Sequence, residues 1–281
     1  MEFIYNTELD EYNFKQINLK SFMQIRIKTE LMKENLKGKV KKYEESIYNA
    51  DDILTNKSRC YFNQKGNKIE YCFYDAVGIL LYKNKYEYDE NENRTSAELQ
   101  WYEAEGSLKK TTYRYDEKGN LIFCDYSVGS YRSYEDYMYY EEENRIDVQI
   151  TQPRFDSLFD KWSSSIETYK YDEKGNLIEK ADDNSTLLER YKYDEKGNRT
   201  EKIKVFFTKT TYKYDAQGNL IEKYLEDTFS EKETYKNKIF TETYDYEYDA
   251  IGNWIQKKYN YIHWSNIDNC ITKTKREIEY Y

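Results

Sequence analysis

The most constraining feature of this chain is the octapeptide Tyr-x-Tyr-Asp-x-x-Gly-Asn, which occurs five times in full. In the cleanest stretch its aspartate recurs as Asp172, Asp194 and Asp215, a period of 21 or 22 residues. That length holds two strands and two turns, so the chain is expected to be an array of β-hairpins. The full copies begin at Tyr113, Tyr169, Tyr191, Tyr212 and Tyr246, and a sixth begins at Tyr86 with Glu92 in place of the glycine.

The polar middle of the motif has the residues of a tight turn. Asp at the first position and Gly at the fourth suit a type I turn, and the aspartate side chain can accept backbone N–H groups two residues on. The glycine can take the left-handed conformation of a G1 bulge, so a positive φ is predicted for Gly175, Gly197 and Gly218. The turn residues are Asp116, Gly119, Asp172, Gly175, Asp194, Gly197, Asp215, Gly218, Asp249 and Gly252.

The turn also predicts a strand register. If Asp172 pairs with Asn176, Tyr171 faces Leu177 and Lys170 faces Ile178. Side chains alternate along a strand, so the two motif tyrosines share one face of the sheet. These tyrosine rows are the best candidate binding surface, because regularly spaced aromatic rings can stack on sugars or bury against a protein. The rows are Tyr113, Tyr115, Tyr169, Tyr171, Tyr191, Tyr193, Tyr212, Tyr214, Tyr246 and Tyr248, and packing within the sheet is their alternative role.

Weaker copies of the motif extend the array. They begin at Cys60, Cys72 and Tyr137, so about nine units run from Cys60 to Lys257. Twist keeps so many strands from forming a flat open sheet. The predicted fold is all-β, a curled antiparallel β-meander of about nine hairpins with a short N-terminal helix.

The N-terminal segment differs in kind from the repeats. Apolar residues recur at helical spacing between Leu19 and Leu36, and Gly38 is a suitable stop. Such an amphipathic helix can cover the first edge of the sheet or dock on a partner. The predicted domains are therefore residues 1–38, the helical segment, and residues 39–281, the repeat sheet.

Composition bounds the class of protein. Of 281 residues, 38% are hydrophobic and 35% charged, yet 34 tyrosines argue against disorder. The net charge of −9, with lysines interleaved among acids, argues against nucleic-acid binding, which needs a basic stripe. No apolar run is long enough to span a bilayer, and the start lacks the features of a signal peptide. A full-length chain is expected in the cytoplasm, and a chain whose leader was removed in the cell envelope or outside the cell.

Catalytic and metal chemistry find little support. His263 is the only histidine, so a catalytic triad would have to use it; a strand histidine beside Trp264 is the simpler interpretation. The Asp-x-x-Gly-Asn turn offers one carboxylate where a calcium loop needs several oxygen ligands. No phosphate loop or dinucleotide fingerprint is present. We therefore expect no enzyme, no cofactor and no metal.

The cysteines are not spaced as zinc ligands. They are Cys60, Cys72, Cys124 and Cys270. Cys60 and Cys72 both occupy the first tyrosine position of the motif, so each can replace a ring. Because they stand in adjacent units, a disulfide between them in an oxidising compartment is the alternative.

The motif resembles the YD repeat of RHS-type proteins, on the segments 113–121, 169–177, 191–199, 212–220 and 246–254. In the large members of that family such repeats wind into a hollow shell around a toxin domain, and they are linked to carbohydrate binding and cell-surface contact. This chain is too short for a full shell and has no toxin domain after the repeats. It is more similar to small stand-alone YD-repeat proteins of Bacteroidota, at residues 35–40, 252–254 and 276–281.

These observations favour a non-enzymatic binding or scaffold protein whose tyrosine-rich sheet binds a protein partner. The acidic balance predicts a basic partner. The resemblance implies an accessory or immunity role beside a secreted toxin system. The alternative is a carbohydrate-binding protein of the cell envelope.

Overall fold

The computed structural model describes residues 36–102, 108–153, 162–205, 208–227, 238–263 and 270–281. These residues form 18 β-strands in one sheet. In chain order the strands are β1 (Val40–Tyr48), β2 (Leu54–Phe62), β3 (Lys68–Asp75), β4 (Leu80–Tyr88), β5 (Arg94–Trp101), β6 (Leu108–Tyr115), β7 (Leu121–Val128), β8 (Tyr131–Tyr140), β9 (Arg145–Pro153), β10 (Trp162–Tyr171), β11 (Leu177–Ala181), β12 (Leu187–Tyr193), β13 (Arg199–Lys204), β14 (Thr208–Tyr214), β15 (Leu220–Asp227), β16 (Lys238–Tyr248), β17 (Trp254–His263) and β18 (Cys270–Tyr280).

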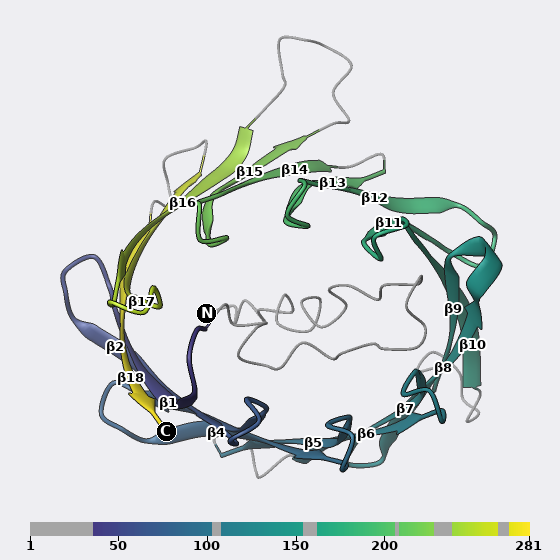
Figure 1. The fold of residues 1–281 in the computed structure, drawn as a ribbon, viewed down its shortest axis with the longest axis horizontal. Coiled ribbons are helices and arrows are strands. Elements are labelled where there is room, and N and C mark those ends of the chain that lie inside the picture. Colours follow the sequence, from purple (N-terminus) through teal and green to yellow (C-terminus); the bar gives the residue numbers. More distant parts are fainter. Residues whose placement is uncertain (1–35, 103–107, 154–161, 206–207, 228–237, 264–269) are drawn as a thin grey trace.

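The sheet is closed. Every strand pairs antiparallel with its neighbour in the chain, and β1 pairs with β18 as well as with β2, which gives the barrel seen end-on in Figure 1. The prediction of an all-β chain is confirmed, but the prediction of a curled meander is wrong, because the first and last strands join. Closure satisfies the backbone N–H and C=O groups that a meander leaves unpaired at its two edges.

The predicted N-terminal helix, Leu19 to Leu36, lies outside the described residues except for Leu36, which is not helical. Within the described ranges the one helical element is a 3₁₀ turn, η3 (Glu141–Glu143). No helix in this part of the chain is long and apolar enough to cross a membrane. The described residues therefore give no support to the prediction of an N-terminal helix.

The segment Leu36–Lys39 reinforces the seam where β18 meets β1. The Lys37 N–H donates to the side-chain oxygen of Asn253 at 2.6 Å, and the Asn253 amide donates to the Lys37 carbonyl at 3.0 Å. Across the seam, Arg276 donates to Glu45 at 2.7 Å in a largely buried ion pair. Asn253 of the last motif turn thus bonds both to Lys37, which precedes β1, and to the Tyr280 hydroxyl of β18.

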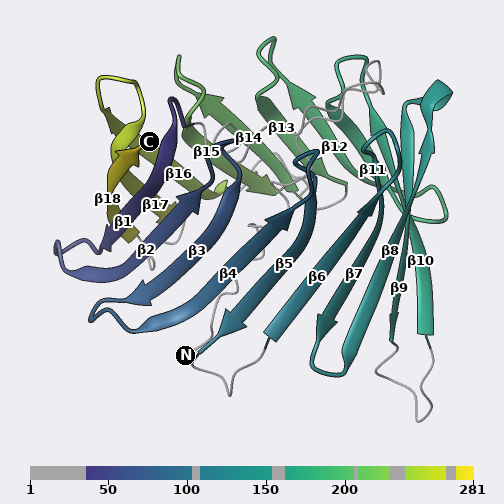
Figure 2. The same ribbon diagram turned by 60° about the horizontal axis from the view of Figure 1, so that its bottom comes forward.

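The motif turns form as expected. The Asp172 N–H donates to the Asn176 carbonyl at 2.9 Å, and one oxygen of the Asp172 carboxylate accepts the N–H groups of Lys174 and Asn176 at 2.9 and 2.8 Å. The φ angles of Gly175, Gly197 and Gly218 are 82°, 81° and 87°, so the prediction of positive φ is confirmed. All full copies lie at one end of the barrel, which is uppermost in Figure 2, and their loops point into the ring in Figure 1.

The predicted register is half right. Tyr171 pairs with Leu177 as expected, but Lys170 pairs with Glu179, so Ile178 is an extra residue in a β-bulge. The same shift follows the motif turns of β12–β13, β14–β15 and β16–β17. The G1-type turn leaves one strand longer by a residue, and each such bulge bends the sheet and increases its twist, which helps so many strands to close.

The two faces of the wall differ in chemistry. The segment Leu36–Lys39, which precedes β1, lies inside the ring (Figure 1, dark purple). Its first residue, Leu36, packs against Tyr43, Cys60 and Phe62. The face that carries these residues therefore lines the interior, and we call it the inner face. Cross-strand partners share a face, so the register can be followed around the whole barrel. Lysines and glutamates dominate the opposite, outer face, as in the pairs Lys192–Glu201 and Lys213–Glu222.

Candidate functional site

All ten tyrosines of the predicted rows lie on the inner face. The register connects them from strand to strand, because Tyr113 pairs with Cys124, Tyr169 with Ile146 and Lys180, and Tyr191 with Lys202. Most are half-buried. The rows thus line the inside of a barrel, whereas the sequence suggested an exposed sheet. Whether they bind a ligand stays a prediction.

The second motif tyrosine clamps adjacent hairpins together. In three copies its hydroxyl donates to the carbonyl that directly follows the motif asparagine of the preceding hairpin. Tyr88 reaches the Lys68 carbonyl at 2.7 Å, and Tyr115 reaches the Arg94 carbonyl at 2.9 Å. Tyr214 makes the equivalent bond to Arg199 at 2.9 Å. These rings are therefore held in fixed positions, which suits both packing and a preorganised binding surface.

Three tyrosines of the later hairpins each belong to an ionic triad. Tyr191 donates to Glu189, two residues earlier on β12, and Lys202 of β13 lies 3.2 Å from the same carboxylate. The same arrangement joins Tyr169 to Glu167 and Lys180, with the lysine at 2.9 Å. A third triad comprises Tyr244, Glu242 and Lys223, with hydroxyl and ammonium 2.6 and 3.5 Å from the carboxylate.

The lysines of these triads belong to a regular belt. Opposite the first tyrosine of four consecutive full motifs stands a lysine on the returning strand, on β11, β13, β15 and β17. We call this set the lysine belt: Lys180, Lys202, Lys223 and Lys257. Sequence reasoning missed it, although each lysine follows its tyrosine by eleven residues. This spacing is visible in the sequence, but only the strand register shows that the four lysines lie on the inner face.

The equivalent positions in the first half of the barrel are not basic. Tyr86 pairs with Ala97, Tyr113 with Cys124 and Tyr137 with Val148. Tyr137, Cys124 and Val148 are core residues, buried together with Ile146. The inner wall thus has an apolar half, β2 to β9, and a charged half, β10 to β17. In Figure 1, β4 to β7 form the lower arc of the ring and β11 to β15 the upper arc.

Ionisation in the charged half is stabilised by its partners. Burial opposes the charge on Glu189, but the hydroxyl of Tyr191 and the ammonium of Lys202 outweigh burial and hold the pKa of this carboxyl below its ordinary value. Lys180 and Lys202 also lie over the rings of Tyr169 and Tyr191, at 5.5 and 5.9 Å from the centroids. Cations at these distances are attracted to the ring faces.

The three cysteines whose side chains the structure describes show no sign of nucleophilic or disulfide chemistry. Burial raises the pKa of the Cys124 thiol to about 12, which keeps the thiol protonated at neutral pH. Cys60 and Cys72 are free thiols. Cys60 pairs with Tyr71 on the inner face, and Cys72 pairs with Arg59 on the outer face, so the alternative of a disulfide between them is wrong. Each cysteine occupies the first tyrosine position of its motif copy, but the two side chains lie on opposite faces of the sheet.

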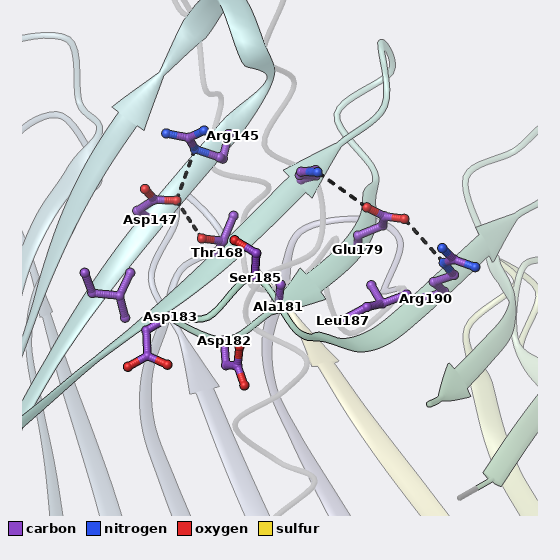
Figure 3. A pocket seen from close by; sticks show the side chains of 12 residues that line it. Arg145, Asp147, Thr168, Glu179, Ala181, Asp182, Asp183, Ser185, Leu187 and Arg190 are labelled. Atoms are coloured by element: carbon purple, nitrogen blue, oxygen red, sulfur yellow. Dashed lines mark hydrogen bonds and ion pairs between the residues drawn. The ribbon is translucent and has the colours of Figure 1, made fainter. Parts of the chain in front are cut away.

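A hollow of about 440 Å³ lies on the outer wall across β9 to β12 (Figure 3). Its charged groups are paired with each other. Asp147 accepts from Thr168 at 2.9 Å and lies 3.2 Å from Arg145, and Glu179 lies 3.3 Å from Arg190. A second hollow, of about 600 Å³, lies between the turns at Asp194 and Asp215. We assign no reaction to either, because their carboxylates are committed to these pairs and turns.

Two expectations on chemistry stay predictions. Among the described residues no group of His, Cys, Asp and Glu side chains is arranged to hold a metal ion. His263 is the last residue of β17, but its side chain lies outside the described part of the chain, as does that of Cys270.

No family model matches this chain, and no curated protein does. Solved structures with similarity include a porin-like protein from Bacteroides uniformis ATCC 8492, with 13% identity over 85% of this chain and 96% of that chain, at a TM-score of 0.42. A porin-like protein from Bacteroides vulgatus ATCC 8482 has 10% identity over 87% and 99%, at 0.40. The TcdB2-TccC3-Cdc42 structure has 12% identity over 77% of this chain but 14% of that chain, at 0.33. Likenesses this distant carry no argument for a function.

Proposed function

We propose that the protein is a non-enzymatic binding protein that holds a polypeptide partner against the inner wall of its barrel. The observation that carries the proposal is the set of clamped tyrosines on the inner face. Rigid aromatic side chains give large contact areas at a small loss of entropy, which is why tyrosine is frequent in protein interfaces. The partner is thus placed inside the barrel instead of on an exposed sheet.

The surroundings of the rings favour a polypeptide over a sugar. Sugars stack on open ring faces, but several inner-face rings already have a cation near one face, such as Arg199 at 4.8 Å from the Tyr212 centroid. The apolar half has Ile146 and Val148 at its core, and the Glu135 carboxylate beside them already accepts from two tyrosine hydroxyls, so few free polar groups remain there to orient sugar hydroxyls. An apolar half facing a charged half suits a chain with one apolar and one charged side.

The proposal fits either compartment considered from the sequence. The outer face carries ion pairs whose lysines are well exposed, such as Lys192 at 70% and Lys213 at 66%. Such a face is suited to water, in the cytoplasm or after export. An accessory or immunity role beside a secreted toxin remains a proposal that rests on the motif resemblance alone.

Two adjacent serines on β10 allow a matched test. Ser165 is exposed on the inner face, where it pairs with Ile150, and Ser164 is exposed on the outer face, where it accepts from Gln149. A photo-crosslinking amino acid would be placed at either position in the source cell. We expect a second polypeptide to be captured from position 165 and not from position 164.

Equal capture at both positions would contradict a partner inside the barrel. No polypeptide at position 165, together with retention of the protein on a polysaccharide column that free sugar reverses, would favour the carbohydrate alternative. Replacing His263 with Gln serves as a further control. We expect capture to be unchanged, because no part of the proposal uses this side chain.

A further inference from the structure

We propose that the lysine belt selects the partner by charge, so that the segment held inside the barrel is acidic. This inference rests on the proposed function and adds the chemistry of the ligand. It reverses the expectation of a basic partner, which came from the charge of the whole chain.

The sign of charge on the inner face differs from that of the whole chain. The net charge of −9 covers all residues, but bases outnumber acids at the inner-face positions of the strands. The bases are Lys68, Arg94, Lys109, Lys180, Arg199, Lys202, Lys204, Lys223, Lys257 and Arg276. The acids are Glu45, Asp75, Glu135, Glu167, Glu189, Asp227 and Glu242. A ligand that lies against the strands themselves, away from the motif turns, therefore meets an excess of positive charge.

The belt also imposes a spacing. Its lysines stand on every second strand, so neighbouring members are separated by about 10 Å across two strand spacings. Carboxylates three residues apart in a polyproline II segment lie on one side of it, about 9 Å apart, and carboxylates seven apart in a helix are separated by about 10.5 Å. An acidic segment with either repeat can meet several belt lysines at once.

The existing ion pairs leave room for such a ligand. The side chains of Lys180 and Glu167 are each 25% exposed although they lie 2.9 Å apart. An ammonium group has three donors, so one lysine can bond its own glutamate and a ligand carboxylate together. The pairs therefore position the ammonium groups and do not exclude an acidic guest.

The same hairpins provide a matched control on the outer face. Lys170, Lys192 and Lys213 stand between the two motif tyrosines, and each is paired with an outer-face glutamate. The triple variant K180Q/K202Q/K223Q removes belt charges, and K170Q/K192Q/K213Q removes the same number of charges from the opposite face. The probe is a fluorescein-labelled peptide of repeated Leu-Ser-Glu units, compared with a Leu-Ser-Lys peptide of equal length.

We expect the wild type to bind the Glu peptide and not the Lys peptide. The belt variant should bind it about 10-fold more weakly or worse, because close charge pairs at interfaces are strongly coupled. The outer variant should stay within about twofold, as expected for charges that do not touch the ligand. Equal losses in both variants, or no loss in the belt variant, would overturn the assignment.

Folding is controlled separately, because the belt variant leaves Glu167, Glu189 and Glu242 without their lysines. In E167Q/K180Q/E189Q/K202Q/K223Q/E242Q each of these pairs is neutralised as a unit, and we expect binding of the Glu peptide to be weakened with an unchanged circular dichroism spectrum. K180R/K202R/K223R keeps the charges and should keep the affinity. If the wild type binds both peptides equally, the charge assignment fails but the polypeptide proposal stands. If it binds neither and position 165 captures no polypeptide, both fail.

Discussion

The apolar and charged halves of the inner wall are built from the same hairpin, yet they stabilise the barrel differently. In both, a tyrosine precedes a tight turn and faces a residue on the returning strand. In the apolar half that residue is Ala97, Cys124 or Val148, and the rings bury against aliphatic neighbours. In the charged half it is a belt lysine, and carboxylates complete the contacts. The repeat therefore conserves the backbone, while one variable position sets the chemistry of the wall.

The largest effect is expected in the apolar half. Ile146 is 2% exposed, and Ile146→Ala should lower the free energy of unfolding by about 2–5 kcal/mol, because it leaves a cavity in a packed core. Ile122→Ala is the control, since Ile122 is 38% exposed and should cost less than about 1 kcal/mol. Urea denaturation measures both. Equal costs would show that the apolar half is not packed as a core.

In the charged half, the pair of Glu189 and Lys202 should be coupled. Their side chains are 14% and 17% exposed, so Glu189→Gln should cost about 1–2 kcal/mol, because a largely buried lysine loses its charged acceptor. A double-mutant cycle with Lys202→Met should recover part of that cost. The exposed outer pair Lys213–Glu222 should show a coupling of about 0–0.5 kcal/mol. A coupling no larger at Glu189 than at Glu222 would contradict the comparison.

Acid should weaken the charged half first. Partner groups outweigh burial and lower the pKa of Glu189, Asp215 and Asp249, and the ammonium of Lys192 lowers that of Glu201. A carboxyl with a lowered folded pKa contributes stability above its unfolded pKa of about 4, and this stability is lost as the pH falls through the folded value. Hydrogen exchange at pH 3 should show faster exchange in β12 to β17 than in β6 to β9. Uniform loss of protection would argue that the halves do not differ.

Two turns of the apolar half depart from the motif and can be repaired. At the β2–β3 turn Asn63 replaces the aspartate, and the buried Asn67 amide nitrogen has no hydrogen-bond acceptor. In a full motif turn the Asn120 amide donates to Asp116 at 2.8 Å. Asn63→Asp should therefore stabilise the protein by about 1 kcal/mol, and the reciprocal Asp172→Asn should destabilise it by a similar amount. Thermal denaturation showing the same sign for both would contradict this account of the turn.

The second repair has the smallest expected effect. Glu92 has a φ of 69°, where the five full copies have glycine. Glu92→Gly should stabilise the protein by about 0.5–1 kcal/mol, because relief of left-handed strain, about 1–2 kcal/mol, exceeds the flexibility added by glycine, about 0.5–1 kcal/mol. The reverse change, Gly197→Val, should cost about 1–2 kcal/mol. An unchanged denaturation midpoint for Gly197→Val would rule out this explanation.

The sequence by itself determined the local structure of this protein. The order of Asp, Gly and Asn dictates the turn through short-range hydrogen bonds and a positive φ, so Gly175 and the pairing of Tyr171 with Leu177 were predictable. The bulge at Ile178 was not, because one extra residue changes the register without changing the pattern of side chains. The candidate site was half predictable: the tyrosine rows were evident, but the belt lysines could not be assigned to either face.

Only the tertiary structure decided closure and the direction of curvature. β1 and β18 stand at opposite ends of the array, and no local signal marks Tyr43 and Ile278 as partners. Alternation along a strand defines two faces but not which one is concave, since that depends on the summed twist and bulges of all the hairpins. Once the barrel closes, the tyrosine face becomes the interior, and residues eleven positions after each tyrosine become the wall that a guest would touch.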